Sequence, residues 1–165
     1  MLKVRLLPFA IKAIVLAIVL SLIWHFVAGF YDALLINASG LFLGSDVILV
    51  AERGGISIYQ PGMLMIGTRS SLFYLGIILV TALIAATPGL KLISRLEYVA
   101  IALLSIFVIH IISILVMAAI APVDKAGIMS SYTNPLRILF FVIGGDLFPV
   151  LIWGLLSHKR FISAD

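Results

Sequence analysis

Two ionisable side chains stand inside long apolar runs of this sequence, where such groups are costly to bury. His110 lies within the run at residues 96–121, and Asp146 lies within the run at residues 136–156. An imidazole and a carboxyl group at similar depth in neighbouring helices can relay a proton or coordinate an ion. The same pair can instead be a buried polar contact that fixes helix packing. Both interpretations stay open on the sequence.

These residues must be positioned by helices that are long enough to cross a membrane. A hydrocarbon core of roughly 30 Å requires about 20 apolar residues in helical form. Four stretches qualify, at residues 8–30, 71–87, 96–121 and 136–156. Counted along these helices, His110 and Asp146 both lie roughly 15–17 Å from the same membrane surface. The predicted fold is therefore an all-α membrane protein, a bundle of four transmembrane helices in a single domain covering residues 1–165.

The composition favours lipid as the solvent. Hydrophobic residues make up 64% of the chain and charged residues 11%, whereas a soluble domain has about a quarter charged residues. Cysteine is absent, which excludes a thiolate nucleophile and cysteine-ligated metals. The basic residues form no stripe, which argues against nucleic acid as a partner. The three histidines have no zinc-ligand spacing, and we expect neither a metal nor another cofactor.

Basic residues at the ends of the apolar runs predict the orientation of the chain. If the N-terminus is cytoplasmic, seven basic residues lie inside and four lie outside, which is the direction of the positive-inside rule. We therefore expect both termini in the cytoplasm. The inner set is Lys3, Arg5, Lys12, Lys91, Arg95, Lys159 and Arg160, and the outer set is Arg53, Arg69, Lys125 and Arg137.

The first outer loop, residues 31–70, holds two predicted elements. Residues 31–44 are apolar but too few to cross the membrane again, so we expect a short helix at the interface or against the bundle. Two short runs with β character follow, at residues 47–51 and 56–59, around the sequence ERGG. A Gly-Gly pair suits a tight turn, which predicts a small β-hairpin outside the membrane.

Few other side chains in the membrane segments could do chemistry. Ser113 lies three residues after His110 on the same helix face. Hydroxyl groups at such positions most often bond to their own helix backbone. No Ser-His-Asp order and no phosphate-binding glycine loop is present. The sequence thus shows no complete catalytic site.

The segment from the hairpin into the second helix contains Gly67 and Arg69 in the stretch MIGTRS, and it resembles the exosortase/archaeosortase family of membrane transpeptidases. In that family the nucleophile lies in a Cys-Ser-Gly-x-Arg-Ser-like motif at the head of a transmembrane helix. The matching stretch is MIGTRS at residues 65–70. Gly67 and Arg69 agree with the motif, whereas Met65 stands in the position of the cysteine.

The resemblance continues through a cytoplasmic basic turn at Arg95 to a helix that carries Asn-x-x-Arg in the family. Here that place is taken by His110, Ile111, Ile112 and Ser113. The family's downstream histidine has no counterpart between Pro122 and Asp146. A thioether cannot attack as a thiolate does, and a serine lacks the charge of arginine. The resemblance therefore implies a catalytically inactive relative in the inner membrane of a prokaryote.

Two functions follow as expectations. The first is a non-enzymatic membrane protein that works through a membrane-protein partner or self-association, such as an accessory subunit of an exosortase-type transpeptidase. Arg69 and the hairpin would then present the binding surface, although Arg69 can equally be an interfacial anchor. The alternative is a small ion- or proton-coupled transporter subunit in which His110 and Asp146 line the path.

Overall fold

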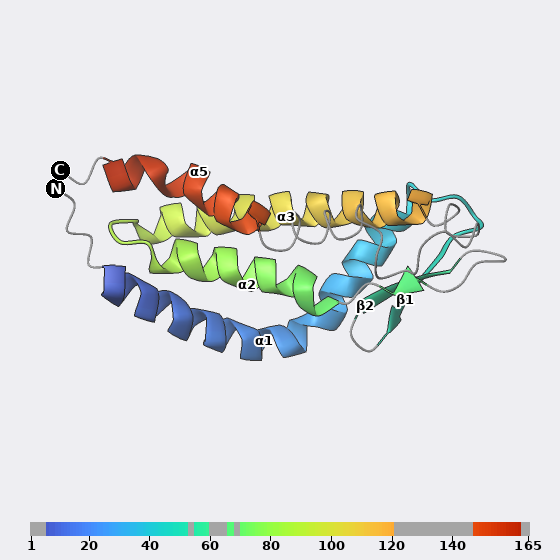
Figure 1. The fold of residues 1–165 in the computed structure, drawn as a ribbon, viewed down its shortest axis with the longest axis horizontal. Coiled ribbons are helices and arrows are strands. Elements are labelled where there is room, and N and C mark those ends of the chain that lie inside the picture. Colours follow the sequence, from blue (N-terminus) through green and yellow to red (C-terminus); the bar gives the residue numbers. More distant parts are fainter. Residues whose placement is uncertain (1–5, 53–54, 60–65, 68–69, 121–146, 163–165) are drawn as a thin grey trace.

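The computed structural model describes residues 6–52, 55–59, 66–67, 70–120 and 147–162. Within these ranges the chain forms four helices and a three-stranded antiparallel sheet (Figure 1). The helices run along a common direction, and the sheet lies at one end of them, which is called the sheet end below. The beginning of α1 and the end of α5 lie at the opposite end (Figure 1). The chain is therefore predominantly helical, as its apolar runs predict.

Helix α1, Leu6–Gly40, is longer than the sequence suggested. The expected span at residues 8–30 does not end before the next segment, and no separate interfacial helix forms at residues 31–44. That expectation was wrong for a local reason. Residues 31–39 contain neither proline nor glycine, so nothing interrupts the hydrogen-bond ladder before Gly40. The helix changes direction along its length, and its final part crosses toward the far end of α3 (Figure 1).

Helices α2, Ser70–Ala86, and α3, Leu92–Ile120, form an antiparallel pair whose boundaries agree closely with the prediction. The turn between them contains Pro88 and Gly89. Proline lacks the amide hydrogen that a continuing helix needs, and Gly89 adopts a φ of 74° that favours glycine. Helix α2 packs against α1, α3 and α5, so it is the central helix of the bundle.

The last helix, α5, spans Phe148–Ile162 and packs on α2 and α3. The sequence predicted a fourth transmembrane segment at residues 136–156. Its first part lies outside the described residues, and the helix itself continues beyond residue 156. The six residues that extend it carry no proline or glycine, so the helix has no local reason to stop earlier.

The predicted hairpin is confirmed. Strands β1, Ile48–Glu52, and β2, Gly55–Tyr59, pair in antiparallel register with Ile48 opposite Tyr59. A third strand, β3, Ile66–Gly67, pairs with the other edge of β2. This third strand was not predicted, because two residues are too few to show the alternation that marks a strand.

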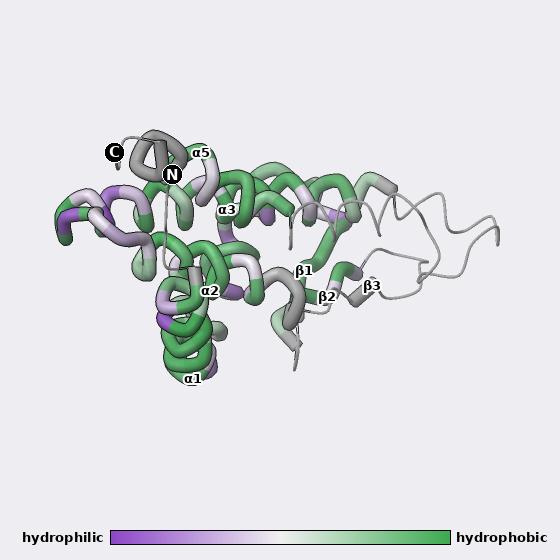
Figure 2. The backbone as a smooth tube through the Cα atoms, turned by 60° about the vertical axis from the view of Figure 1, so that its left-hand side comes forward, coloured by the Kyte–Doolittle hydropathy of each residue, from purple (hydrophilic) through white to green (hydrophobic). Residues whose placement is uncertain are grey.

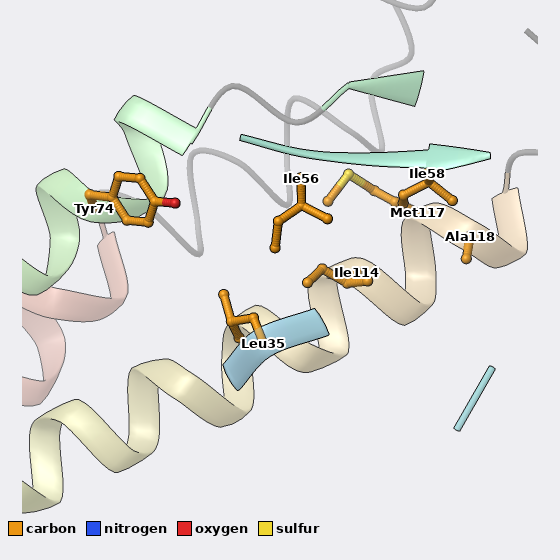
Figure 3. Packing of buried hydrophobic residues seen from close by; sticks show 7 residues of the cluster. All are labelled: Leu35, Ile56, Ile58, Tyr74, Ile114, Met117 and Ala118. Carbon is orange, nitrogen blue, oxygen red and sulfur yellow. The ribbon is translucent and has the colours of Figure 1, made fainter. Parts of the chain in front are cut away.

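The hairpin packs against the helices through β2. Ile56 and Ile58 are 4% and 2% exposed, and they join a hydrophobic cluster built from α1, α2 and α3 (Figure 3). The other members of this cluster are Leu35, Tyr74, Ile114, Met117 and Ala118. Since both Ile56 and Ser57 are buried, both faces of β2 are covered. The sheet is thus fixed to the bundle rather than attached only by its linkers.

Two helices are long and apolar enough to cross a membrane, α1 over Leu7–Gly40 and α3 over Leu92–Ala119. Most of their length is hydrophobic (Figure 2). Helices α2 and α5 contain shorter apolar stretches, Tyr74–Ala86 and Phe148–Ser157. Among the residues described here, two of the four predicted crossings are therefore helices long enough to span a membrane, and the other two correspond to shorter apolar helices.

Shortening Ile58 tests whether the hairpin is held by packing. We expect Ile58→Ala to lower the free energy of unfolding by about 2–5 kcal/mol, because the side chain removed is buried. Ile48→Ala is the matched control, since Ile48 lies in the paired strand but is 60% exposed. Unfolding in mixed micelles of dodecyl sulfate gives both values. Equal effects of the two substitutions would show that β2 does not pack on the helices.

Candidate functional site

The structure places three of the five sequence-predicted site residues. His110 and Ser113 are buried on α3, and each is 1% exposed. Gly67 lies in β3, close in sequence to the start of α2. Arg69 and Asp146 lie outside the described residues. The predicted contact between His110 and Asp146 therefore stays a prediction, whereas other partners of His110 are visible.

His110 is bonded to a residue that the sequence placed in the outer loop. The hydroxyl oxygen of Tyr31 lies 2.8 Å from Nδ1 of His110. The two rings meet edge to face, with centroids 5.9 Å apart. If the neutral imidazole carries its proton on Nε2, the phenol donates to Nδ1. This contact joins α1 to α3.

The next residue of α1 makes a second polar contact, to a different helix. The hydroxyl group of Tyr74 on α2 donates a hydrogen bond to Oδ1 of Asp32. Asp32 is 8% exposed, so this carboxyl group is largely removed from solvent. Successive residues of a helix point about 100° apart, and neighbouring positions can therefore reach different helices. Tyr31, Asp32, Tyr74 and His110 are called the polar cluster below.

Aromatic rings enclose the polar cluster. The Trp24 ring lies 5.4 Å from the ring of Tyr31 and 5.1 Å from the ring of Tyr74. Tyr31 also contacts the rings of Tyr74 at 6.1 Å and Phe107 at 5.9 Å, both edge to face. Such distances and tilts are favourable for aromatic pairs. The cluster is thus a packed contact among α1, α2 and α3.

The sequence indicated His110 but not the other residues of the polar cluster. Tyr31 and Asp32 follow the stretch predicted as the first span, so they were assigned to the loop. The contact depends on α1 continuing past that boundary. Residues 30–39 contain neither proline nor glycine, and this feature of the sequence indicates that the helix can continue past residue 30.

Ser113 does not pair with His110. Its hydroxyl group donates to the carbonyl oxygen of Ile109 at 2.8 Å, which is the expected bond to its own helix backbone. Nδ1 of His110 is engaged by Tyr31. In the part of the chain that the structure describes, the two residues thus form no nucleophile and base pair.

A second polar contact joins the helices at the end opposite the sheet. The indole Nε1 of Trp153 on α5 donates to Oγ1 of Thr87 at 3.0 Å. Nη2 of Arg95 on α3 donates to the carbonyl oxygen of Thr87 at 3.2 Å. Phe9 of α1 stacks on Trp153 at 5.9 Å. Arg95, which the resemblance placed in a basic turn, thus caps the carbonyl end of α2.

The site offers little to a metal ion. Among the residues described, no group of three or more His, Cys, Asp or Glu side chains is close enough to hold one. The polar cluster contains one imidazole and one carboxyl group, and each bonds to a tyrosine. Hydroxyl, imidazole and carboxyl groups in such contacts can donate and accept protons.

Comparison of the chain with protein families, with curated proteins and with solved structures finds no match. The likeness to exosortases therefore stays a prediction based on the residues quoted above.

Removing either tyrosine hydroxyl group of the polar cluster tests its importance for stability. We expect Tyr31→Phe and Tyr74→Phe each to lower the free energy of unfolding by about 1–3 kcal/mol, because each leaves a buried acceptor without its donor. Tyr98→Phe is the control, since Tyr98 is a half-buried residue of α3 outside the polar cluster. Losses as small as that of Tyr98→Phe would show that the cluster does not hold the helices together.

Proposed function

We propose that the chain is an integral membrane protein with four membrane-crossing segments and cytoplasmic termini. The supporting observation is the distribution of its side chains. Only 6% of the most apolar stretch of α1 and 28% of that of α3 is buried. A core helix of a soluble protein would be largely covered, whereas lipid accepts an apolar surface.

Polar side chains show the complementary pattern. Asp32, His110 and Ser113 are buried between helices, while large apolar residues such as Phe26 and Leu104 are exposed at 85% and 66%. Helices in lipid associate through close packing and polar contacts, because apolar side chains gain little by leaving lipid. A helix bundle in lipid is therefore expected to have polar groups inside and apolar side chains on its surface.

Helices α2 and α5 are short for a full crossing, with 17 and 15 residues. Seventeen residues extend over roughly 25 Å, somewhat less than the hydrocarbon thickness. A central helix tolerates this shortfall, because α2 is surrounded by α1, α3 and α5 and the hairpin contacts it at the sheet end. The apolar run at residues 136–156 supports the fourth crossing.

The protein acts, in this proposal, as a non-enzymatic partner of another membrane protein at the outer surface. The orientation predicted from the basic residues puts the sheet end outside. There β1 exposes Ile48 and Val50, at 60% and 38%. Exposed apolar side chains on a strand outside the hydrocarbon favour a protein partner.

The partner class comes from the resemblance around residues 65–70. Met65 in place of the cysteine removes the nucleophile, while Gly67 and Arg69 are retained. The engagement of His110 with Tyr31, and of Ser113 with its own helix, also supports a structural rather than a catalytic use of these positions. An exosortase-type transpeptidase is accordingly the proposed partner.

The topology is testable with single cysteines, because the natural sequence has none. We expect Ser45→Cys to react with a membrane-impermeant maleimide in intact cells, because Ser45 lies exposed at the sheet end. Lys91→Cys and Ser163→Cys should react only after permeabilisation. Reaction of Ser45→Cys and Lys91→Cys from the same side would exclude a crossing by α2. Outside labelling of Ser163→Cys would exclude the fourth crossing.

The partner is testable by copurification from mild detergent. We expect wild-type chain, tagged at its C-terminus, to recover a cysteine-containing membrane transpeptidase, and recovery to fall at least about tenfold in Ile48→Glu and Arg69→Ala, the loss expected for a hot-spot residue. Ser45→Glu is the control, since it adds the same charge at a nearby exposed position. Recovery of the chain alone, or only of further copies of itself, would contradict the proposed partner.

A further inference from the structure

Asp32 is a carboxyl group inside the bundle with an unusual set of neighbours. Its one hydrogen bond within the described chain comes from the uncharged hydroxyl group of Tyr74, and it forms no ion pair there. We propose that the Asp32 carboxyl group is a proton-binding site inside the bundle, and that its protonation state is coupled to the packing of the hairpin on α2. This site does not depend on the partner proposed above.

Burying a charged carboxylate between helices is costly. A carboxylate removed from water needs a cation or several donors to compensate, and otherwise a proton neutralises it. A phenol hydroxyl group can donate to a carboxylate, and it can also accept from a carboxylic acid. The contact between Asp32 and Tyr74 can therefore persist in both states, which lets the site take up and release a proton without unfolding.

Among the described residues, the titratable side chains of the polar cluster besides Asp32 are two phenols and one imidazole. Tyr31 comes from α1, Tyr74 from α2 and His110 from α3, and Tyr59 is the titratable residue of β2. No lysine or arginine in the described ranges contacts this group. Within the described residues, the Asp32 carboxyl group thus has a hydroxyl donor but no cation as its partner.

The position of Asp32 suits exchange with the solution at the sheet end. It lies eight residues before the last residue of α1, Gly40, which corresponds to roughly 12 Å along the helix. Thr87, the residue after the opposite end of α2, lies thirteen residues beyond Tyr74, or roughly 20 Å. The shorter path for a proton thus leads past the hairpin.

Tyr74 links the proton site to the hairpin. The same side chain that donates to Asp32 belongs to the hydrophobic cluster that contains Ile56 and Ile58 of β2 (Figure 3). Ionisation of Asp32 strengthens its hydrogen bond with the Tyr74 hydroxyl group, since hydrogen bonds to ionised acceptors are shorter and stronger. A displacement of this ring changes the surface on which β2 packs.

Trp24 provides a reporter for the experiment. The chain has two tryptophans, so Trp153→Phe leaves Trp24 as the single fluorophore, with its ring 5.1 Å from Tyr74. In lipid nanodiscs titrated from pH 4 to pH 9, we expect one sigmoidal change in Trp24 emission that corresponds to one proton. Asp32→Asn should abolish the change, because the amide keeps an acceptor for Tyr74 but cannot titrate. Asp46→Asn, at an exposed aspartate, should retain it.

Two outcomes of the titration would overturn the proton site. One is a flat emission profile in the Trp153→Phe protein, with circular dichroism showing that it is folded. The other is a transition that survives in Asp32→Asn and disappears in His110→Gln, which would assign the proton to the imidazole.

The coupling to the hairpin needs a separate measurement. Hydrogen exchange of the β2 amides, corrected for the intrinsic effect of pH, should differ on the two sides of the transition in the wild-type chain. The difference should vanish in Asp32→Asn and persist in Asp46→Asn. Equal protection of β2 in both protonation states would overturn the coupling even if Trp24 reports a titration.

Discussion

Two consecutive residues of α1 hold the central helices together, and the remaining architecture depends on them. Tyr31 reaches His110 on α3, and Asp32 reaches Tyr74 on α2. For helices in lipid, moving apolar side chains from lipid into a helix interface changes the free energy little. Hydrogen bonds between helices therefore contribute strongly to which helix faces meet. A pair of adjacent side chains that bond to two different helices fixes both the rotation of α1 and its height along the bundle.

The contact around Thr87 complements this one at the opposite end. Thr87 accepts from Trp153 and, through its carbonyl group, from Arg95. Its own hydroxyl group donates to the carbonyl oxygen of Leu83 at 2.7 Å. The central helix α2 is thus held by polar contacts near both of its ends. Between these contacts α2 packs on its neighbours through its own apolar side chains, such as Ile77, Val80 and Ile84. This arrangement lets a helix of 17 residues keep its position between the longer helices α1 and α3.

His110, Ser113 and Arg95, which the sequence singled out, make contacts within the described helices. The proposed likeness to exosortases puts His110 and Ser113 in the place of Asn-x-x-Arg, yet His110 bonds to α1 and Ser113 to its own helix. Arg95 caps α2. His110 and Arg95 thus join neighbouring helices, and the partner surface proposed above is the sheet end, where β1 exposes Ile48 and Val50.

Local features of the sequence determined the elements, and the tertiary structure decided the contacts. Pro88 and Gly89 end α2 through their own backbone properties, and the Gly-Gly pair at residues 54–55 suits a hairpin turn, so both could be predicted. The polar cluster could not, because its hydrogen bonds join residues 42 and 79 positions apart, and no local pattern encodes such a distance. The extension of α1 through residues 31–40 depends on both the local sequence and the tertiary structure. Its helical form is local, but only its packing against α2 and α3 buries Asp32 and half-buries Tyr31 between the helices.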